Sequence, residues 1–164
     1  MYFFRSTYVG SQLLMCYEFK LSEKIKITII NIYGKYEHQK VENYDKEYIS
    51  YSDTTIHRML SDIVPIIIKA ESNNIIVLGG DLNADVNAKK GHYDKPIFDR
   101  IENLGFKNLT QNIITYEHGI QDDYIFLYDG LNLTKPTQPI INKDVDIQEI
   151  SPHYFIKVNL KIDL

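Results

Sequence analysis

The sequence predicts an α+β fold in which a mixed sheet is layered with helices. The central observation is the stretch from Ile75 to Leu78, four consecutive apolar residues typical of a strand with both faces covered. Helical patterns lie on either side of it, at residues 54–70 and 94–104. Strand patterns precede the first helix and follow the second, so strands and helices must share one layered core.

Composition limits the class of protein. A chain of 164 residues predicts one domain, residues 1–164, with a single core. Its net charge of −4 argues against a broad positively charged surface for nucleic acid, although a bound divalent metal would supply local positive charge. Cys16 is the only cysteine, residues 1–5 lack the basic start and long apolar region of a secretory signal, and no apolar run approaches the roughly 20 residues of a membrane span. We therefore expect an intracellular protein, cytoplasmic or nuclear.

The N-terminal third predicts a hairpin followed by a loop. Residues 12–19 and 25–33 are rich in apolar and β-branched side chains, and the polar segment 21–24 separates them. We expect the two strands to be antiparallel. Residues 34–51 are polar and tyrosine-rich without a period, which predicts a loop.

Two helices are expected around the central strand. Apolar residues of 54–70 form one stripe at helical spacing, with Pro65 predicted to kink it. The strand should then run over 75–79 and end at its glycines. The second helix is expected over 94–104, with Pro96 in its first turn and Gly105 just past its end.

The C-terminal part predicts strands separated by a long connection. Residues 106–109 form a short strand candidate, and acidic residues directly precede an apolar strand within 121–129. Residues 135–151 contain two prolines and are expected to be a connection. An alternating strand over 153–161 should close the chain.

Polar residues follow or precede strands at several separate places, and each has an unremarkable interpretation by itself. Asp and Asn are ordinary turn formers, an acidic pair often ends a strand, and a lone histidine is usually structural or on the surface. The residues concerned are Asn31 with Tyr33, Asp81 with Asn83, Asp122 with Asp123, and His153.

Taken together and in this order, these residues resemble the endonuclease/exonuclease/phosphatase superfamily, the metal-dependent phosphoesterases related to apurinic endonucleases and DNase I. The family's Gly-Asp-Phe/Leu-Asn signature corresponds to Gly80–Asn83, its Asp-Tyr-Ile-Phe segment to Asp123–Phe126, and its Ser-Asp-His to Ser151–His153. The segment Asn31–Tyr33 matches the family's strand-end motif. The resemblance implies a DNase I-like layered α/β sandwich that lacks its N-terminal part.

The resemblance also implies a role for each matching residue. Asp81 would orient and deprotonate the attacking water, and Asn83 would hold the scissile phosphate. His153 would stabilise the negative charge that develops on the phosphate oxygens. Asp123 would accept a hydrogen bond from the other nitrogen of His153, and Tyr33 would reach a phosphate oxygen.

The implied cofactor is Mg²⁺, with Mn²⁺ as the alternative, held by Asp81 and Asn83. The implied partner is a phosphate-ester substrate, with nucleic acid among the candidates. The sequence does not choose between DNA, RNA, phosphoinositides and other phosphate esters.

Two departures from the family pattern leave a second hypothesis open. Pro152 replaces the metal-associated Asp of the family, and no segment before Asn31 matches the family's Asn and Gln-Glu motifs. The chain is then either a metal-dependent phosphoesterase or a truncated, non-catalytic relative that serves in binding or assembly. The strands at 27–32 and 75–78 are too apolar to face solvent, so we also expect a partner chain, a dimer or a rearranged packing to cover the inner face of the sheet.

Overall fold

The computed structural model describes residues 14–33, 74–82, 84, 95–117, 119–143 and 151–163. The predicted loop at 34–51, the predicted helix at 54–70, and Asn83 lie outside these residues. Within the described part, no helix is both long and apolar enough to cross a membrane.

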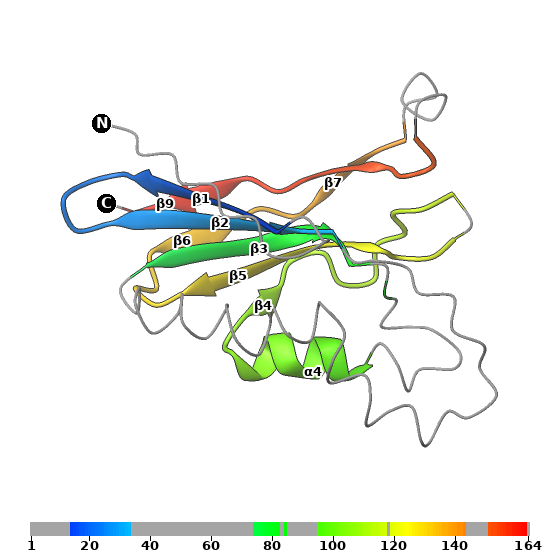
Figure 1. Cartoon of the computed structure of the whole chain (residues 1–164). Helices are drawn as coiled ribbons and strands as arrows, with labels where there is room; N and C mark the ends of the chain where they lie inside the picture. The colour runs from blue at the N-terminus through cyan, green and yellow to red at the C-terminus, as the bar shows by residue number, and fades with distance from the viewer. Residues whose placement is uncertain are drawn as a thin grey trace.

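A five-stranded mixed sheet in the order β1-β2-β3-β5-β4 forms the centre of the molecule (Figure 1). Strands β1 (Leu14–Lys20) and β2 (Lys26–Ile32) are antiparallel, which confirms the predicted hairpin. Strand β2 runs parallel to β3 (Ile75–Asp81), and β3 runs antiparallel to β5 (Asp123–Asp129). The short β4 (Lys107–Asn108) pairs with the far edge of β5.

Strand β3 is longer than its sequence predicted. We expected Gly79 and Gly80 to end it, but the strand continues to Asp81 because both glycines pair with β5. Long-range pairing therefore overrides the weak strand preference of glycine. The consequence is that Asp81 lies directly opposite Asp123 in the antiparallel register.

Helix α4 (Lys95–Asn103) covers one face of this sheet, as its sequence predicted. It ends just before Gly105, whose φ of +91° is a conformation that glycine adopts without strain. Phe98 and Ile101 of the helix are buried, and the Phe98 ring meets the Tyr124 ring edge-on with centroids 4.7 Å apart. The core on this face consists of Ile30, Ile32, Ile76, Leu78, Leu82, Ala84, Phe98, Ile101, Phe106, Tyr124 and Phe126.

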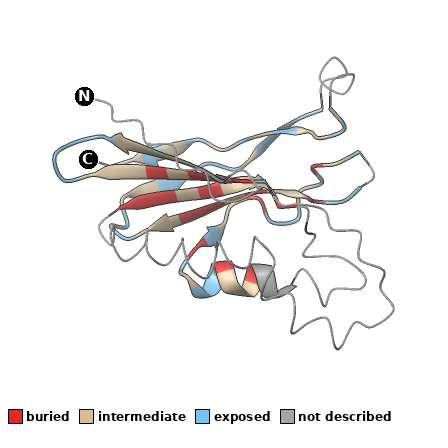
Figure 2. Cartoon of the chain, viewed as in Figure 1, coloured by how far each residue is buried: buried red, intermediate tan, exposed pale blue. Residues whose placement is uncertain are grey.

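The opposite face of the sheet is covered less completely. Alternation along the strands places another set of apolar side chains there, of which Ile75 and Leu127 are buried. The remaining ones, Ile27, Ile29, Val77 and Ile125, are only half-buried. Figure 2 shows buried and intermediate stretches side by side along the strands of the main sheet. In Figure 1, β7 and β9 run along this side, away from α4.

Short antiparallel pairs form this second layer. Strand β6 (Thr134–Pro136) pairs with β9 (Leu160–Ile162), and β7 (Ile140–Asn142) pairs with β8 (Phe155–Lys157). The expectation that residues 135–151 are only a connection was therefore wrong.

The predicted closing strand over 153–161 is broken into β8 and β9. Thr134 pairs with Ile162, and Ile140 pairs with Lys157. Between these two pairs the first strand advances by six residues, whereas its partner moves back by only five. This shift of one residue is the mark of a β-bulge, which interrupts the ladder between the two pairs. The sequence pattern of alternation does not reveal such a shift.

Candidate functional site

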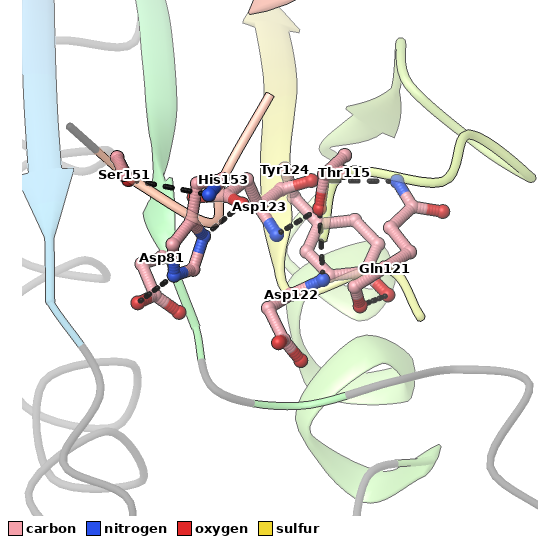
Figure 3. Close-up of polar contacts among 8 residues, drawn as sticks. All are labelled: Asp81, Thr115, Gln121, Asp122, Asp123, Tyr124, Ser151 and His153. Atoms are coloured by element: carbon pink, nitrogen blue, oxygen red, sulfur yellow. Dashed lines mark hydrogen bonds and ion pairs between the residues drawn. The ribbon is translucent and has the colours of Figure 1, made fainter. Parts of the chain in front are cut away.

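Two aspartates from neighbouring strands face each other at one end of the sheet (Figure 3). Asp81 ends β3 and Asp123 begins β5, and the register pairs them directly. Like charges directly opposite each other in an antiparallel pair are destabilising. Strand alternation also places both side chains on the second, less covered face, towards the layer from which His153 comes.

His153 lies between the two carboxylates. Its Nδ1 atom is 2.8 Å from Oδ2 of Asp123, a hydrogen bond, and its Nε2 atom is 4.0 Å from Oδ2 of Asp81. The second distance is too long for a direct hydrogen bond. Nε2 is therefore directed towards Asp81 and can form a hydrogen bond with a ligand or a water molecule placed between the two groups.

The surroundings of His153 favour its charged form. Burial by itself lowers the pKa of His153, but the hydrogen bond to Asp123 and the negative charges of Asp123, Asp81 and Asp122 together raise it above its ordinary value of 6.5. In this form Nδ1–H donates to the Asp123 carboxylate. The imidazolium thus offsets the repulsion between the two opposed aspartates.

Local contacts hold the backbone and ring of His153 in place. The backbone N–H of His153 donates to Oγ of Ser151 at 3.2 Å, so the serine of the predicted Ser-Pro-His motif shapes the turn. His153 also forms a β-bridge with Tyr116. The rings of these two residues meet edge-on with centroids 5.0 Å apart.

Pro152 contributes backbone rather than a ligand. Its carbonyl accepts the N–H of Glu117 at 3.1 Å, and its side chain is exposed. The position where the resemblance implies a metal-associated carboxylate therefore ties the His153 segment to the loop at 113–117.

The other predicted site residues are placed differently. Asn83 lies outside the described residues, so its role stays a prediction. Tyr33 follows β2 and is 51% exposed. Within the described part of the chain, no hydrogen bond or ring contact joins Tyr33 to Asp81, Asp123 or His153.

Asn31 lies close to the end of β3. It pairs with Gly79 in the parallel register, and its Oδ1 lies 2.9 Å from the point where a Cβ on Gly80 would be. The side-chain amide of Asn31 therefore lies close to the backbone of Gly80, the residue before Asp81. The end of β2 therefore lies next to the end of β3.

Two buried residues near the site had no distinguishing signal in the sequence. Thr115 is fully buried, and Gln121 is 3% exposed. Gln121 accepts the N–H of Ile113 and donates to the carbonyl of Thr110. Both contacts join residues distant in sequence, so no local pattern predicts them.

The aspartates and the histidine also have a donor set that suits a divalent cation. Asp81, Asp123 and His153 each offer one ligand atom, and these atoms lie within 4.8 Å of one another. Carboxylate oxygens suit Mg²⁺ and Mn²⁺, and an imidazole nitrogen suits transition metals. The residues present therefore fit a divalent cation at this end of the sheet.

Comparisons with known proteins bear on the fold. No protein-family model and no curated protein sequence matches the chain. Solved structures do match it, among them an endonuclease/exonuclease/phosphatase from Beutenbergia cavernae, with a TM-score of 0.65 and 12% identity over 92% of this chain and 39% of that one.

Two further solved structures show the same likeness. The human nocturnin catalytic domain with bound sulfate has a TM-score of 0.58 and 10% identity over 98% of this chain and 57% of that one. D. rerio TDP2 complexed with a single-strand DNA product has a TM-score of 0.54 and 13% identity over 92% of this chain and 62% of that one. The chain thus spans 39% to 62% of the three structures' lengths. The DNase I-like layered fold expected from the sequence is confirmed, and the chain has the architecture of endonuclease/exonuclease/phosphatase structures over the part that it spans.

Proposed function

We propose that this chain is a metal-dependent phosphoesterase domain of the endonuclease/exonuclease/phosphatase type, which hydrolyses phosphodiesters or phosphomonoesters. The single observation that carries the proposal is His153, held by Asp123 at 2.8 Å and directed towards Asp81 at 4.0 Å. The fold shared with endonuclease/exonuclease/phosphatase structures supports it. In this proposal the chain forms a single domain and acts inside the cell.

The side chains of the site have complementary tasks in this reaction. Asp81 accepts a proton from the attacking water as a general base. The Nε2–H of His153 donates to a phosphate oxygen on which negative charge develops. Asp123 accepts from Nδ1–H and so keeps the ring oriented and charged. A bound Mg²⁺ or Mn²⁺, held by Asp81 with Asn83, would supply additional positive charge.

The class of substrate is the least constrained part of the proposal. D. rerio TDP2 is complexed with a single-strand DNA product in its solved structure, which supports nucleic acid as a candidate. The net charge of −4 works against a broad polyanion-binding surface. A phosphate ester recognised mainly at the reacting phosphate is therefore the form of substrate that we propose.

Hydrolysis of a generic aryl phosphodiester and an aryl phosphomonoester in the presence of Mg²⁺ or Mn²⁺ tests this proposal. Asp81→Asn should reduce the rate by about 10²- to 10⁴-fold, because it removes the general base. His153→Gln should reduce it by about 10²- to 10³-fold, because it removes the charged donor.

A matched control is available at an exposed aspartate. Asp163 is 45% exposed and pairs with Lys135, in the second layer. Asp163→Asn should keep the full rate. Absence of metal-dependent hydrolysis in the unaltered chain, or equal losses in Asp81→Asn and Asp163→Asn, would contradict the proposal.

The second candidate function is a non-catalytic binding or assembly module. It is favoured by the backbone role of Pro152 and by the half-buried apolar side chains of the second face. In this case a partner chain or a second copy would cover that face. The metal distinguishes the two candidates, because a cation bound only by the native state raises the melting temperature. A rise with Mg²⁺ or Mn²⁺ that is lost in Asp81→Asn favours the enzyme, and no rise favours the module.

A further inference from the structure

Thr115 connects the two segments that carry Asp123 and His153. Figure 3 shows its side chain at the start of β5. Asp123 and His153 lie thirty positions apart in the sequence and belong to different layers of the fold. Their 2.8 Å hydrogen bond can form only if the start of β5 and the segment before β8 are held at a fixed separation. We propose that Thr115 is a positioning residue that holds Asp123 and His153 in register for the proposed reaction.

The side chain of Thr115 fixes the start of β5. Its Oγ1 accepts the backbone N–H of Asp122 at 3.0 Å and the backbone N–H of Asp123 at 3.0 Å. A threonine hydroxyl oxygen has two lone pairs, so both can be used in this way. Thr115 is fully buried, so the loss of its hydroxyl acceptor there is destabilising.

The backbone of the same residue fixes the segment that carries His153. The carbonyl of Thr115 accepts the N–H of Tyr154, the residue after His153, at 2.7 Å. The neighbouring Tyr116 forms the β-bridge with His153 itself. One residue therefore contacts the strand of Asp123 through its side chain and the segment of His153 through its main chain.

Thr110 provides a matched comparison within the same loop. It is also fully buried, and its Oγ1 accepts the N–H of Ile125, two residues further along β5, at 3.0 Å. Unlike Thr115, it has no described hydrogen bond to residues 151–154. A purely structural role predicts similar effects at the two threonines, whereas a positioning role predicts an effect on His153 from Thr115 alone.

The test compares Thr115→Val, Thr115→Ser and Thr110→Val in the full chain. The main readout is the downfield proton resonance of His153 Nδ1–H, which requires the hydrogen bond to Asp123 and protection from water. It should be lost in Thr115→Val, because the valine methyl group cannot accept the two N–H groups. It should be retained in Thr115→Ser, which keeps the hydroxyl, and in Thr110→Val. Thr115→Ala removes the same acceptor with less crowding and decides the question if Thr115→Val does not fold.

Kinetics gives a second readout, and this part rests on the proposed function. Thr115→Val should lower kcat of the phosphodiester reaction by about 10²-fold with little change in KM, since misplaced groups lose rate more than binding. Thr115→Ser should restore most of the rate.

The outcomes separate this inference from the proposed function. Retention of the resonance in Thr115→Val or Thr115→Ala, or its equal loss in Thr110→Val, would overturn the positioning role. If the resonance behaves as expected and the unaltered chain hydrolyses no phosphate ester, the positioning role stands and the proposed function fails.

Discussion

At the scale of single residues, the site resolves an electrostatic conflict that the strand pairing creates. The register places Asp81 directly opposite Asp123. Without a positive charge nearby, the two carboxylates would repel each other. His153 fits between them, and its raised pKa is the expected response to two negative neighbours. The sequence motifs predicted these three residues as a group, and the structure brings them together. It does not join Tyr33 to them by any described contact.

The pH dependence of stability should report the charge on His153. Its folded pKa is raised, so its contribution is fully present below about pH 6.5 and is lost as the pH rises through the folded pKa. The free energy of unfolding of the unaltered chain should therefore exceed that of His153→Gln most clearly in acid. Urea unfolding at several pH values measures this difference. A difference that grows as the pH rises would contradict the assignment.

At the scale of elements, the end of β3 depends on close contact with β2. Gly80 has a φ of +126°, and a Cβ there would lie 2.1 Å from the carbonyl oxygen of Ile32. No side chain larger than hydrogen fits without moving the end of one strand. The sequence predicted a special role for this glycine as a turn, but the structure shows that it permits strand pairing up to Asp81.

Gly80→Ala should therefore be destabilising and should disturb the site. We expect a loss of about 3 kcal/mol or more in the free energy of unfolding, because backbone strain adds to the clash with Ile32. Gly119→Ala is the matched control: its φ is also positive, +81°, but nothing lies within 4 Å of the added Cβ. It should lose only about 1–2 kcal/mol. Equal losses in the two variants, measured by urea unfolding, would show that the clash has no effect.

At the scale of the whole molecule, the two faces of the main sheet are covered unequally. Helix α4 and its neighbours bury the first face, where Leu78 and Phe126 have no exposed surface. On the second face, short strand pairs leave Ile29 and Val77 half-buried. Among the described elements, the second layer consists of two-stranded pairs and contains no sheet as wide as the five-stranded one.

Two adjacent residues of β3 should reveal this inequality. Leu78 points to the first face and Val77 to the second. Leu78→Ala should lower the free energy of unfolding by about 2–5 kcal/mol, because it leaves a cavity in a closed core. Val77→Ala should cost only about 1 kcal/mol, because its side chain is already partly in water. Comparable losses in urea unfolding would mean that the second face is as well covered as the first.

The sequence by itself determined the elements whose signals are local. The β1–β2 hairpin, the core of β3, helix α4 and the apolar body of β5 each carry their own periodicity or capping residues. The order of the motifs also predicted which acidic residues and which histidine would meet. Only the tertiary structure decided the rest, including the extension of β3, the broken strands β6 to β9, and the bridging role of Thr115. These features depend on hydrogen bonds between residues far apart in the chain, whose free energy no local pattern records.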